Sequence, residues 1–501
     1  MPRSADLALP RRPLRLAGGA ALALAIAVLV GTLFWSIYAA ATTQPPGSAS
    51  VDLGYLIYIT TLQATLSTVL SLLVGVALAW ALNRLRFAGR ELVIGLFASA
   101  IVTPGLVVAF GLLSVWGRAG WLGFAGVPVF GLGGVVAAHL ILDGAFAARI
   151  LLARLDAIPE GRLKTGQSLA LTPWSRFAVI DWPALRGTLP GLAAIIFLLA
   201  FTSFPIVLLL GGGPSVQTLE IAIYSAVRLD FDLGLAVKLA LVQIALCAVV
   251  ILVSSAVAPI SSSLDRPAQP PWRDTGAARA MQWAVLIVAL LGFASPLLAT
   301  LLDGLAGLGD VLGQRDFWAA VATSLWIAVA SSLVALVLAL TLAAARAATP
   351  SRTARVLLGA PAYAYLAVPA VTLALGAFLL VRQVGMLPET AAPLVVVIAN
   401  ALLSLPFAMA TLAPPIEAIA RARGKLIRSL GLSGHRQFVA VEWPLIARDV
   451  GLVLALSFCF SLGDLGVIAL FGTQDFTTLP LLMVRPIFGP KYLSAYPTTC
   501  K

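Results

Sequence analysis

Eleven long apolar runs divide this chain, and short polar segments join them. An α-helix needs about 20 apolar residues to cross a hydrocarbon core of about 30 Å, because backbone polar groups in lipid must find their partners within the segment. With 60% hydrophobic and 11% charged residues, the chain falls outside the soluble globular classes. We therefore predict an all-α polytopic membrane protein with spans near 16–41, 57–82, 92–116, 131–153, 190–210, 234–257, 281–302, 318–345, 355–381, 392–413 and 449–472.

The first run, 16–41, has the outline of a cleavable signal peptide, because arginines precede it and three alanines end it. The apolar region of a secretory signal covers only about 7–15 residues. Because this run is longer, we predict that it is retained as a transmembrane helix.

The net charge of +12 is concentrated in alternate connections between the apolar runs. Such an asymmetry sets membrane orientation, since loops rich in Lys and Arg stay in the cytoplasm. A nucleic-acid surface is therefore not indicated, and the N-terminus is predicted to be cytoplasmic. The predicted cytoplasmic segments are 1–15, 83–91, 154–188, 258–280, 346–355 and 414–448.

Residue types that build metal, disulfide or nucleotide sites are not clustered. Cys247 and Cys459 lie inside apolar runs and Cys500 lies near the C-terminus, so no disulfide framework is indicated. His139 and His435 lack the acidic or thiol companions of a metal site, and we expect structural roles for both. No Gly-x4-Gly-Lys-[Ser/Thr] motif occurs, so the chain is predicted to have no ATPase site and no catalytic residues of its own.

Two polar stretches, 170–183 and 431–444, match each other at an offset of 261 residues. Pro104 with Gly111 recurs as Pro369 with Gly376 at a similar offset, so the chain is a tandem repeat. Both copies have the same orientation, and we expect an axis along the membrane normal with a pathway at their interface. The predicted domains are a first half at 1–257, a cytoplasmic linker at 258–280 and a second half at 281–501.

The repeat predicts six helices in each half, but the second half has only five apolar runs. The partner of the run at 234–257 is expected near 494–518, whereas the sequence given stops at Lys501. We expect that a truncation or frameshift after about residue 485 has removed the twelfth helix.

Each polar stretch places a small residue, nine residues, a β-branched residue, a carboxylate, Trp and Pro in that order. The small residue permits a sharp turn, and the proline favours the start of a helix. A short amphipathic helix of this kind can lie in a groove of a partner. We call the stretches the first and second docking loops; their key residues are Ala170, Ile180, Asp181, Trp182 and Pro183, and Gly431, Val441, Glu442, Trp443 and Pro444.

The second docking loop resembles the end of the Glu-Ala-Ala-x3-Gly-x9-Ile-x-Leu-Pro loop of binding-protein-dependent ABC importer permeases. The first loop is similar, with Ala170 for the glycine, and the Glu-Ala-Ala positions are occupied by 164–166 and 425–427. Duplicated chains of this type resemble thiamine and ferric-iron permeases. The stretches 210–224 and 461–480 are more similar to thiamine and thiamine pyrophosphate permeases.

The resemblance implies the fold of a type I ABC importer permease in the bacterial inner membrane. It also implies that the loops dock into two copies of a cytoplasmic ATPase, which uses ATP and Mg, while an external binding protein delivers thiamine or its pyrophosphate. Ferric iron is an alternative cargo. An ion-coupled secondary transporter is an alternative of another class, although few carboxylates lie in the apolar runs.

Five carboxylates are candidate functional residues. Asp464 attracts a cationic ligand in one reading and stabilises a glycine-rich break in the other, while Asp143 lines the pathway or pairs with Arg149. Glu220 contacts the binding protein or is solvated. Asp181 and Glu442 contact the ATPase or anchor the loops to their own basic residues. Trp182 and Trp443 are expected to anchor the loops at the bilayer surface.

Overall fold

The computed structural model describes residues 13–43, 51–211, 213, 216–255, 272–364 and 368–488, and these residues form helices without any strand. The prediction of an all-α polytopic membrane protein is confirmed. The expected twelfth helix lies outside the described residues, as does most of the expected linker at 258–280.

Eight helices in the described part of the chain are long and apolar enough to cross a membrane, or up to ten if two bent pairs each count as one span. One pair joins Arg90–Ile101 to Gly105–Trp116 at 113°, and the other joins Pro173–Arg186 to Leu189–Phe201 at 58°. Eleven apolar runs were predicted as spans, and these counts are lower because several of the runs are broken into shorter or bent helices.

Prolines account for two of these breaks. Pro104 and Pro369, which the repeat pairs, are the N-caps of α4 (Gly105–Trp116) and α17 (Ala370–Gln383), with ψ of 136° and 143°. A proline lacks the N–H that would continue a helix through this position. The expected span 355–381 is consequently divided between α16 (Arg352–Ala364) and α17.

The helices group into two compact units. One unit contains residues 50–222 and 245–311. Its helices are α2 (Leu53–Arg84), α3 (Arg90–Ala98), α4, α5 (Leu132–Asp156), α6 (Glu160–Ser168), α7 (Pro173–Arg176), α8 (Trp182–Arg186), α9 (Leu189–Phe201), α10 (Pro205–Leu210) and α13 (Gly276–Ala306).

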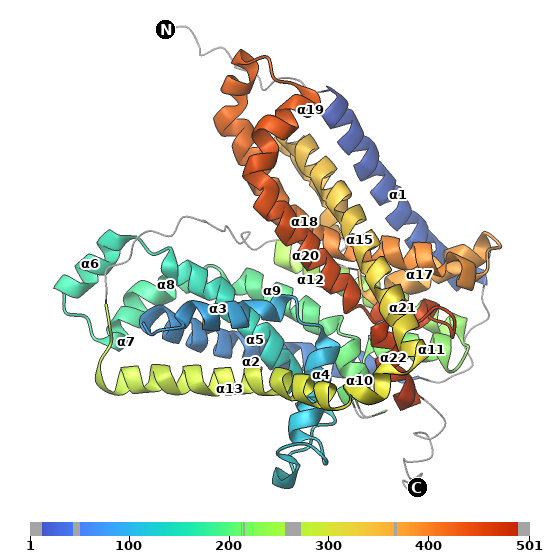
Figure 1. Cartoon of the computed structure of the whole chain (residues 1–501), viewed down its shortest axis with the longest axis horizontal. Helices are drawn as coiled ribbons and strands as arrows, with labels where there is room; N and C mark the ends of the chain where they lie inside the picture. The colour runs from blue at the N-terminus through green and yellow to red at the C-terminus, as the bar shows by residue number, and fades with distance from the viewer. Residues whose placement is uncertain are drawn as a thin grey trace. The chain divides into compact units, whose positions relative to one another are not determined.

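The core of this unit lies where α2 packs closely against α5. A Cβ atom added at Gly75 would lie 2.5 Å from the Cβ of Ala147, so a small residue is required there. Leu, Ala and Phe side chains fill the surrounding interior, and Phe293 of α13 packs on Phe97 with ring centroids 5.5 Å apart. Figure 1 shows α13 lying along this group of helices.

The other unit contains residues 1–49, 223–244 and 312–501. Its helices are α1 (Pro13–Thr43), α15 (Arg315–Ala347), α16, α17, α18 (Pro388–Ser429), α19 (Gly434–Gln437), α20 (Trp443–Leu462), α21 (Gly466–Phe471) and α22 (Leu479–Phe488). Parts of α11 (Leu219–Arg228) and α12 (Leu233–Ser255) also belong to it, and α14 (Leu308–Leu312) lies at the boundary between the units.

The first helix of each sequence half belongs to the unit formed mainly by the other half. Helix α1 packs on α15 and α17, and α13 packs on α2 and α4. In Figure 1, α1 in dark blue lies beside the yellow α15. The compact units therefore differ from the predicted halves 1–257 and 281–501. The two halves describe the repeat along the sequence and stay a prediction.

Candidate functional site

The two docking loops have the same backbone path. Ala170 and Gly431 adopt φ of 48° and 61°, in the left-handed region that favours glycine. The N–H groups of the next residues, Leu171 and Leu432, donate to the carbonyls of Gly166 and Ile427, at 3.3 and 3.0 Å. This pattern ends a helix with a sharp turn. Alanine in the first loop thus takes the path that the glycine motif requires, at a conformational cost of about 1–2 kcal/mol.

A π-helical segment follows in both loops, at Phe177–Asp181 and Phe438–Glu442. Such segments are rare and often occur at functional sites. Each one ends on the carboxylate of the loop and leads into a helix that begins with Trp-Pro, where a proline needs no N–H partner. The repeat therefore covers backbone geometry as well as residue types.

Both carboxylates point into the protein, where arginines from long helices hold them. Asp181 is 1% exposed and forms an ion pair with Arg84 at the end of α2. Glu442 is 6% exposed and accepts two hydrogen bonds from Arg15 of α1, at 2.7 and 3.1 Å. The Nε2 group of Gln437 donates to the same carboxylate. This geometry is that of anchoring, with partners from α1 and α2 in place of the expected basic residues of the loops.

The Asp181 carboxyl lies in the polar docking loop, which precedes the apolar helix α9. Burial raises its pKa to about 6, and the positive charge of Arg84 opposes that rise. Because both side chains are buried, loss of either partner would leave the other charge uncompensated. The ion pair therefore ties the position of the first docking loop to the end of α2.

Apolar side chains form the outward face of the loops. Leu169 and Leu430 precede the turn in each loop and are 67% and 61% exposed. Trp182 and Trp443 are 41% and 43% exposed. Ile180 is buried and Val441 is half-buried, so the β-branched residue of the motif faces inward. Leu169 and Leu430 were not among the predicted loop residues, although the same residue at an offset of 261 positions was a usable signal.

Asp464 stabilises the start of α21. Its carboxylate accepts hydrogen bonds from the backbone N–H groups of Gly466 at 3.1 Å and Val467 at 3.3 Å. This is the geometry of the glycine-rich break that one reading of the sequence expected. A role of Asp464 in the pathway stays a prediction.

Asp143 pairs with a residue other than the expected Arg149. Its Oδ2 atom lies 3.0 Å from Nδ1 of His139, one helical turn earlier on α5, and both side chains are buried. The expectation that His139 has no acidic companion is therefore wrong. No group of three or more metal-ligating side chains occurs among the residues that the structure covers. A pathway role for Asp143 is untested.

Glu220 is the second residue of α11 and is fully buried. The solvated position that one alternative expected is therefore wrong. A contact between Glu220 and a binding protein stays a prediction, and it would require a conformation in which the carboxylate is open to solvent.

No family model matches the chain. It is 36% identical over 438 residues to the thiamine transport system permease protein ThiP of Brucella melitensis, an alignment that covers 84% of this chain and 80% of the relative. The chain belongs to the thiamine transport system permease family. The family predicted from the docking loops and the stretches around them is thus confirmed.

Other members of this family extend the comparison. ThiP of Escherichia coli K12 is 36% identical over 444 residues, covering 85% of this chain and 82% of the relative. ThiP of Haemophilus influenzae is 32% identical over 494 residues, covering 95% of this chain and 91% of the relative. A molybdenum transport system permease protein, ModB of Azotobacter vinelandii, is 30% identical over 167 residues, which cover 32% of this chain and 74% of ModB.

Proposed function

We propose that this chain is the permease subunit of a binding-protein-dependent ABC importer that moves thiamine or thiamine pyrophosphate across the bacterial inner membrane. The observation that carries the proposal is the pair of docking loops, which share a turn, a π-helical segment and an anchored carboxylate. A repeated structure of this kind fits two copies of one partner. The resemblance of the loops to those of ABC permeases favours a cytoplasmic ATPase as that partner, and the sequence given has no phosphate-binding loop of its own.

Exposed apolar side chains support protein docking at these loops. Leu430 is 61% exposed in the second loop, and Leu169 and Trp174 are 67% and 74% exposed in the first. Contiguous exposed apolar surface commonly marks a protein or membrane contact. The short helices of each loop would lie in a groove of the ATPase, in the manner of an amphipathic helix on its target.

The anchored carboxylates give the docking loops a route into the membrane domain. When ATP closes the two ATPase subunits, each loop would be displaced. The Asp181–Arg84 ion pair would pass this displacement to α2, which packs against α5. In this proposal the permease supplies no chemistry, and it converts a movement at the loops into alternating access of a pathway.

The substrate assignment rests on the family. The curated relatives that match most of the chain are named as thiamine transport permeases, which favours thiamine over ferric iron. An external binding protein would present the substrate on the opposite face. The distribution of Lys and Arg supports a cytoplasmic position for the N-terminus and both docking loops.

Uptake in reconstituted vesicles tests this function. The permease is inserted with its ATPase, the binding protein is added outside, and labelled thiamine and ATP hydrolysis are measured together. We expect uptake that requires ATP and is reduced by unlabelled thiamine pyrophosphate but not by ferric iron. Thiamine uptake by the permease alone, driven by an ion gradient, would contradict the proposal. Competition by ferric iron would overturn the substrate assignment alone.

A further inference from the structure

Arg15 connects the start of α1 to the second docking loop. Its guanidinium group holds both carboxylate oxygens of Glu442, although the two residues are 427 positions apart. The side chains of Arg15 and Glu442 are 21% and 8% exposed. A two-bond contact between these planar groups fixes orientation as well as distance. By sequence, α1 begins the first half and Glu442 belongs to the second.

Helix α1 is firmly packed within the same unit. A Cβ atom added at Gly19 would lie 2.1 Å from the Cβ of Ala345 in α15, so the two helices approach closely. Near the other end of α1, the Ser36 hydroxyl donates to the carbonyl of Gly376 at 2.8 Å, and Gln383 donates to the Ser36 carbonyl at 3.3 Å. Arg15 therefore contacts the loop from a helix whose position is fixed along its length.

Trp272 makes the corresponding connection to the first docking loop. It lies just before α13, the first helix of the second half, and the guanidinium carbon of Arg176 lies 3.8 Å from the centroid of its ring. The carbonyl of Trp272 also accepts a hydrogen bond from Arg176, at 3.4 Å. A Cβ atom at Gly166 would approach the Trp272 ring to 2.9 Å. The indole thus occupies space that only glycine leaves open.

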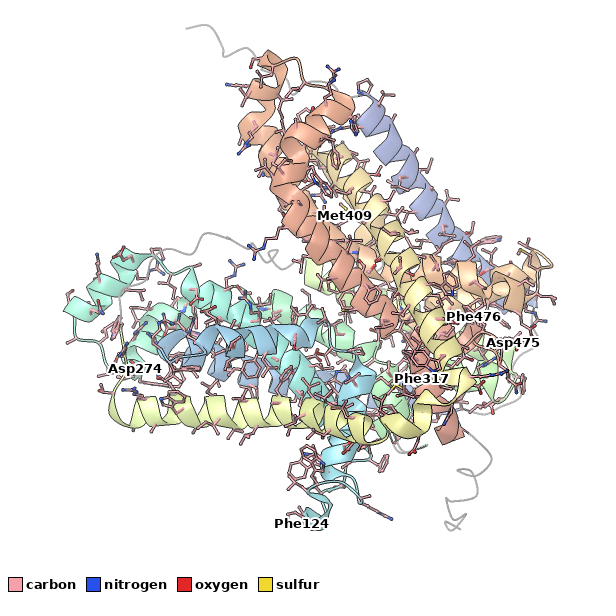
Figure 2. The ribbon with its side chains drawn as sticks, viewed as in Figure 1. Phe124, Asp274, Phe317, Met409, Asp475 and Phe476 are labelled. Carbon is pink, nitrogen blue, oxygen red and sulfur yellow. The ribbon has the colours of Figure 1, made fainter. Side chains whose placement is uncertain are left out.

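Asp274 strengthens the same connection. Its Oδ2 atom lies 3.8 Å from Nε of Arg84, which also pairs with Asp181, and it accepts a hydrogen bond from Gln282 at 2.6 Å. Figure 2 shows Asp274 at the start of α13, beside the helices of the loop. Both loops are therefore fastened by residues at the start of a first helix that comes from the other sequence half.

We propose that these contacts are clasps, in which Arg15 positions the second docking loop and Trp272 positions the first. This inference rests on the proposed function, because it assigns the clasps to the coupling of ATP hydrolysis to transport. A displacement of either loop would therefore be passed to the start of a first helix that comes from the other sequence half. Arg15 and Trp272 are positioning residues, and neither is expected to touch substrate or ATP.

The Arg15 clasp is tested by reversing charges in the complete complex in vesicles. The variants are Arg15→Glu, Glu442→Arg, the double exchange and Arg15→Lys; Arg352→Glu, an exposed position on α16, is the matched control. We expect each single reversal to raise the ATP hydrolysed per thiamine transported about fivefold or more. The double exchange restores most of the coupling, and the lysine variant is intermediate because it loses the two-bond contact.

The Trp272 clasp is tested in the same assay with Trp272→Ala and Trp272→Phe. We expect the alanine variant to uncouple hydrolysis from transport and the phenylalanine variant to retain most coupling, since an aromatic ring still covers Arg176. Co-purification of the ATPase and elution as a single size-exclusion peak show whether a variant is folded. If a variant does not fold, the lysine, phenylalanine and double-exchange proteins still decide the question.

The outcomes separate the two proposals. If the wild-type complex shows no ATP-dependent thiamine uptake, the proposed function fails. If the wild-type complex transports thiamine and folded clasp variants keep the normal ratio of ATP to thiamine, the clasp inference is refuted while the proposed function stands. A double exchange no better coupled than the single reversals would also refute the clasp between Arg15 and Glu442.

Discussion

Removal of the Arg84 guanidinium should be among the most damaging single changes in the protein. The side chains of Arg84, Asp181 and Asp274 are 0%, 1% and 2% exposed. Arg84→Ala therefore leaves the Asp181 and Asp274 carboxylates beside a cavity, without the positive charge that faced them. Breaking a buried ion pair by removing one partner typically costs about 3–5 kcal/mol. Arg346 provides a matched control, because it ends α15 as Arg84 ends α2.

Arg346 pairs with Glu417 in a more open setting, where the side chains are 21% and 15% exposed. Water compensates part of any charge left there, so Arg346→Ala should cost about 1 kcal/mol. The difference between the two alanine variants is then at least about 2 kcal/mol. The estimate rests on burial and on Arg355, which lies 3.9 Å from Glu417 and still faces that carboxylate when Arg346 is removed.

Thermal unfolding of the detergent-purified variants measures this difference. Because membrane proteins often unfold irreversibly, the transition temperatures are compared at one heating rate, with the folded yield as a second measure. A third variant, Arg84→Met with Asp181→Leu, should recover most of the loss, because it replaces the ion pair with apolar side chains. Asp274 keeps a partner in this variant, since Gln282 donates to it at 2.6 Å.

Equal transition temperatures for Arg84→Ala and Arg346→Ala would refute this reasoning. They would mean that burial does not decide the cost of losing the arginine. A double variant no more stable than Arg84→Ala would show that the uncompensated Asp181 charge is not the source of the loss.

Three further changes follow from local geometry, each measured by thermal unfolding. Gly431→Ala should lower the stability by about 1 kcal/mol, because φ is 61°; there is no steric term, since an added Cβ meets nothing within 4 Å. Ala170→Gly should be neutral or slightly stabilising, because glycine adopts this backbone conformation without strain. Gly111→Ala should cost about 1–3 kcal/mol because its Cβ would lie 2.3 Å from a carbonyl oxygen of α13; Gly95→Ala, in open space, should cost nothing. Asp464→Ala should cost about 1 kcal/mol, while Asp464→Asn should keep the helix cap; loss of thiamine uptake in the asparagine variant would instead indicate a role for the charge.

Much of the fold and the docking loops could be predicted because they depend on local signals. Apolar runs of about 20 residues predict membrane helices from length alone, and the offset of 261 residues between the loops needs only the comparison of the chain with itself. The positions of Asp181 and Glu442 followed from this repeat. Their burial did not, since a carboxylate in a polar loop is as often solvated as paired.

Hydropathy alone could not predict the breaks in the spans. An average over apolar residues contains no information about backbone hydrogen bonds, and Pro369 removes one in the middle of the run at 355–381. The pairing of Pro104 with Pro369 in the repeat was the available signal. Two prolines at the same place in two long apolar runs indicate breaks more strongly than either proline alone.

The contacts of Arg15 and Trp272 with the loops could not be predicted, because they depend on the exchange of the first helices between the compact units. Arg15 lies 427 residues from Glu442, and no local pattern relates them. Trp272 lies in the polar stretch before α13, and nothing in its neighbourhood distinguishes it from a solvated residue. Both contacts require a first helix to pack on the other half, which is a property of topology.

The departure of both loops from the second alanine of the Glu-Ala-Ala motif gains a physical explanation from these contacts. Gly166 stands at the second alanine position, and the Trp272 ring and Ile180 fill the space that a side chain there would take. Ile427 stands at the same position of the second loop and is 2% exposed, so its own side chain fills the equivalent space. The same packing site is thus filled in two ways. In the first loop the Trp272 ring enters it from another segment, and in the second loop the Ile427 side chain fills it. Gly166→Ile should therefore displace Trp272 and mimic Trp272→Ala, although it leaves the indole itself unchanged.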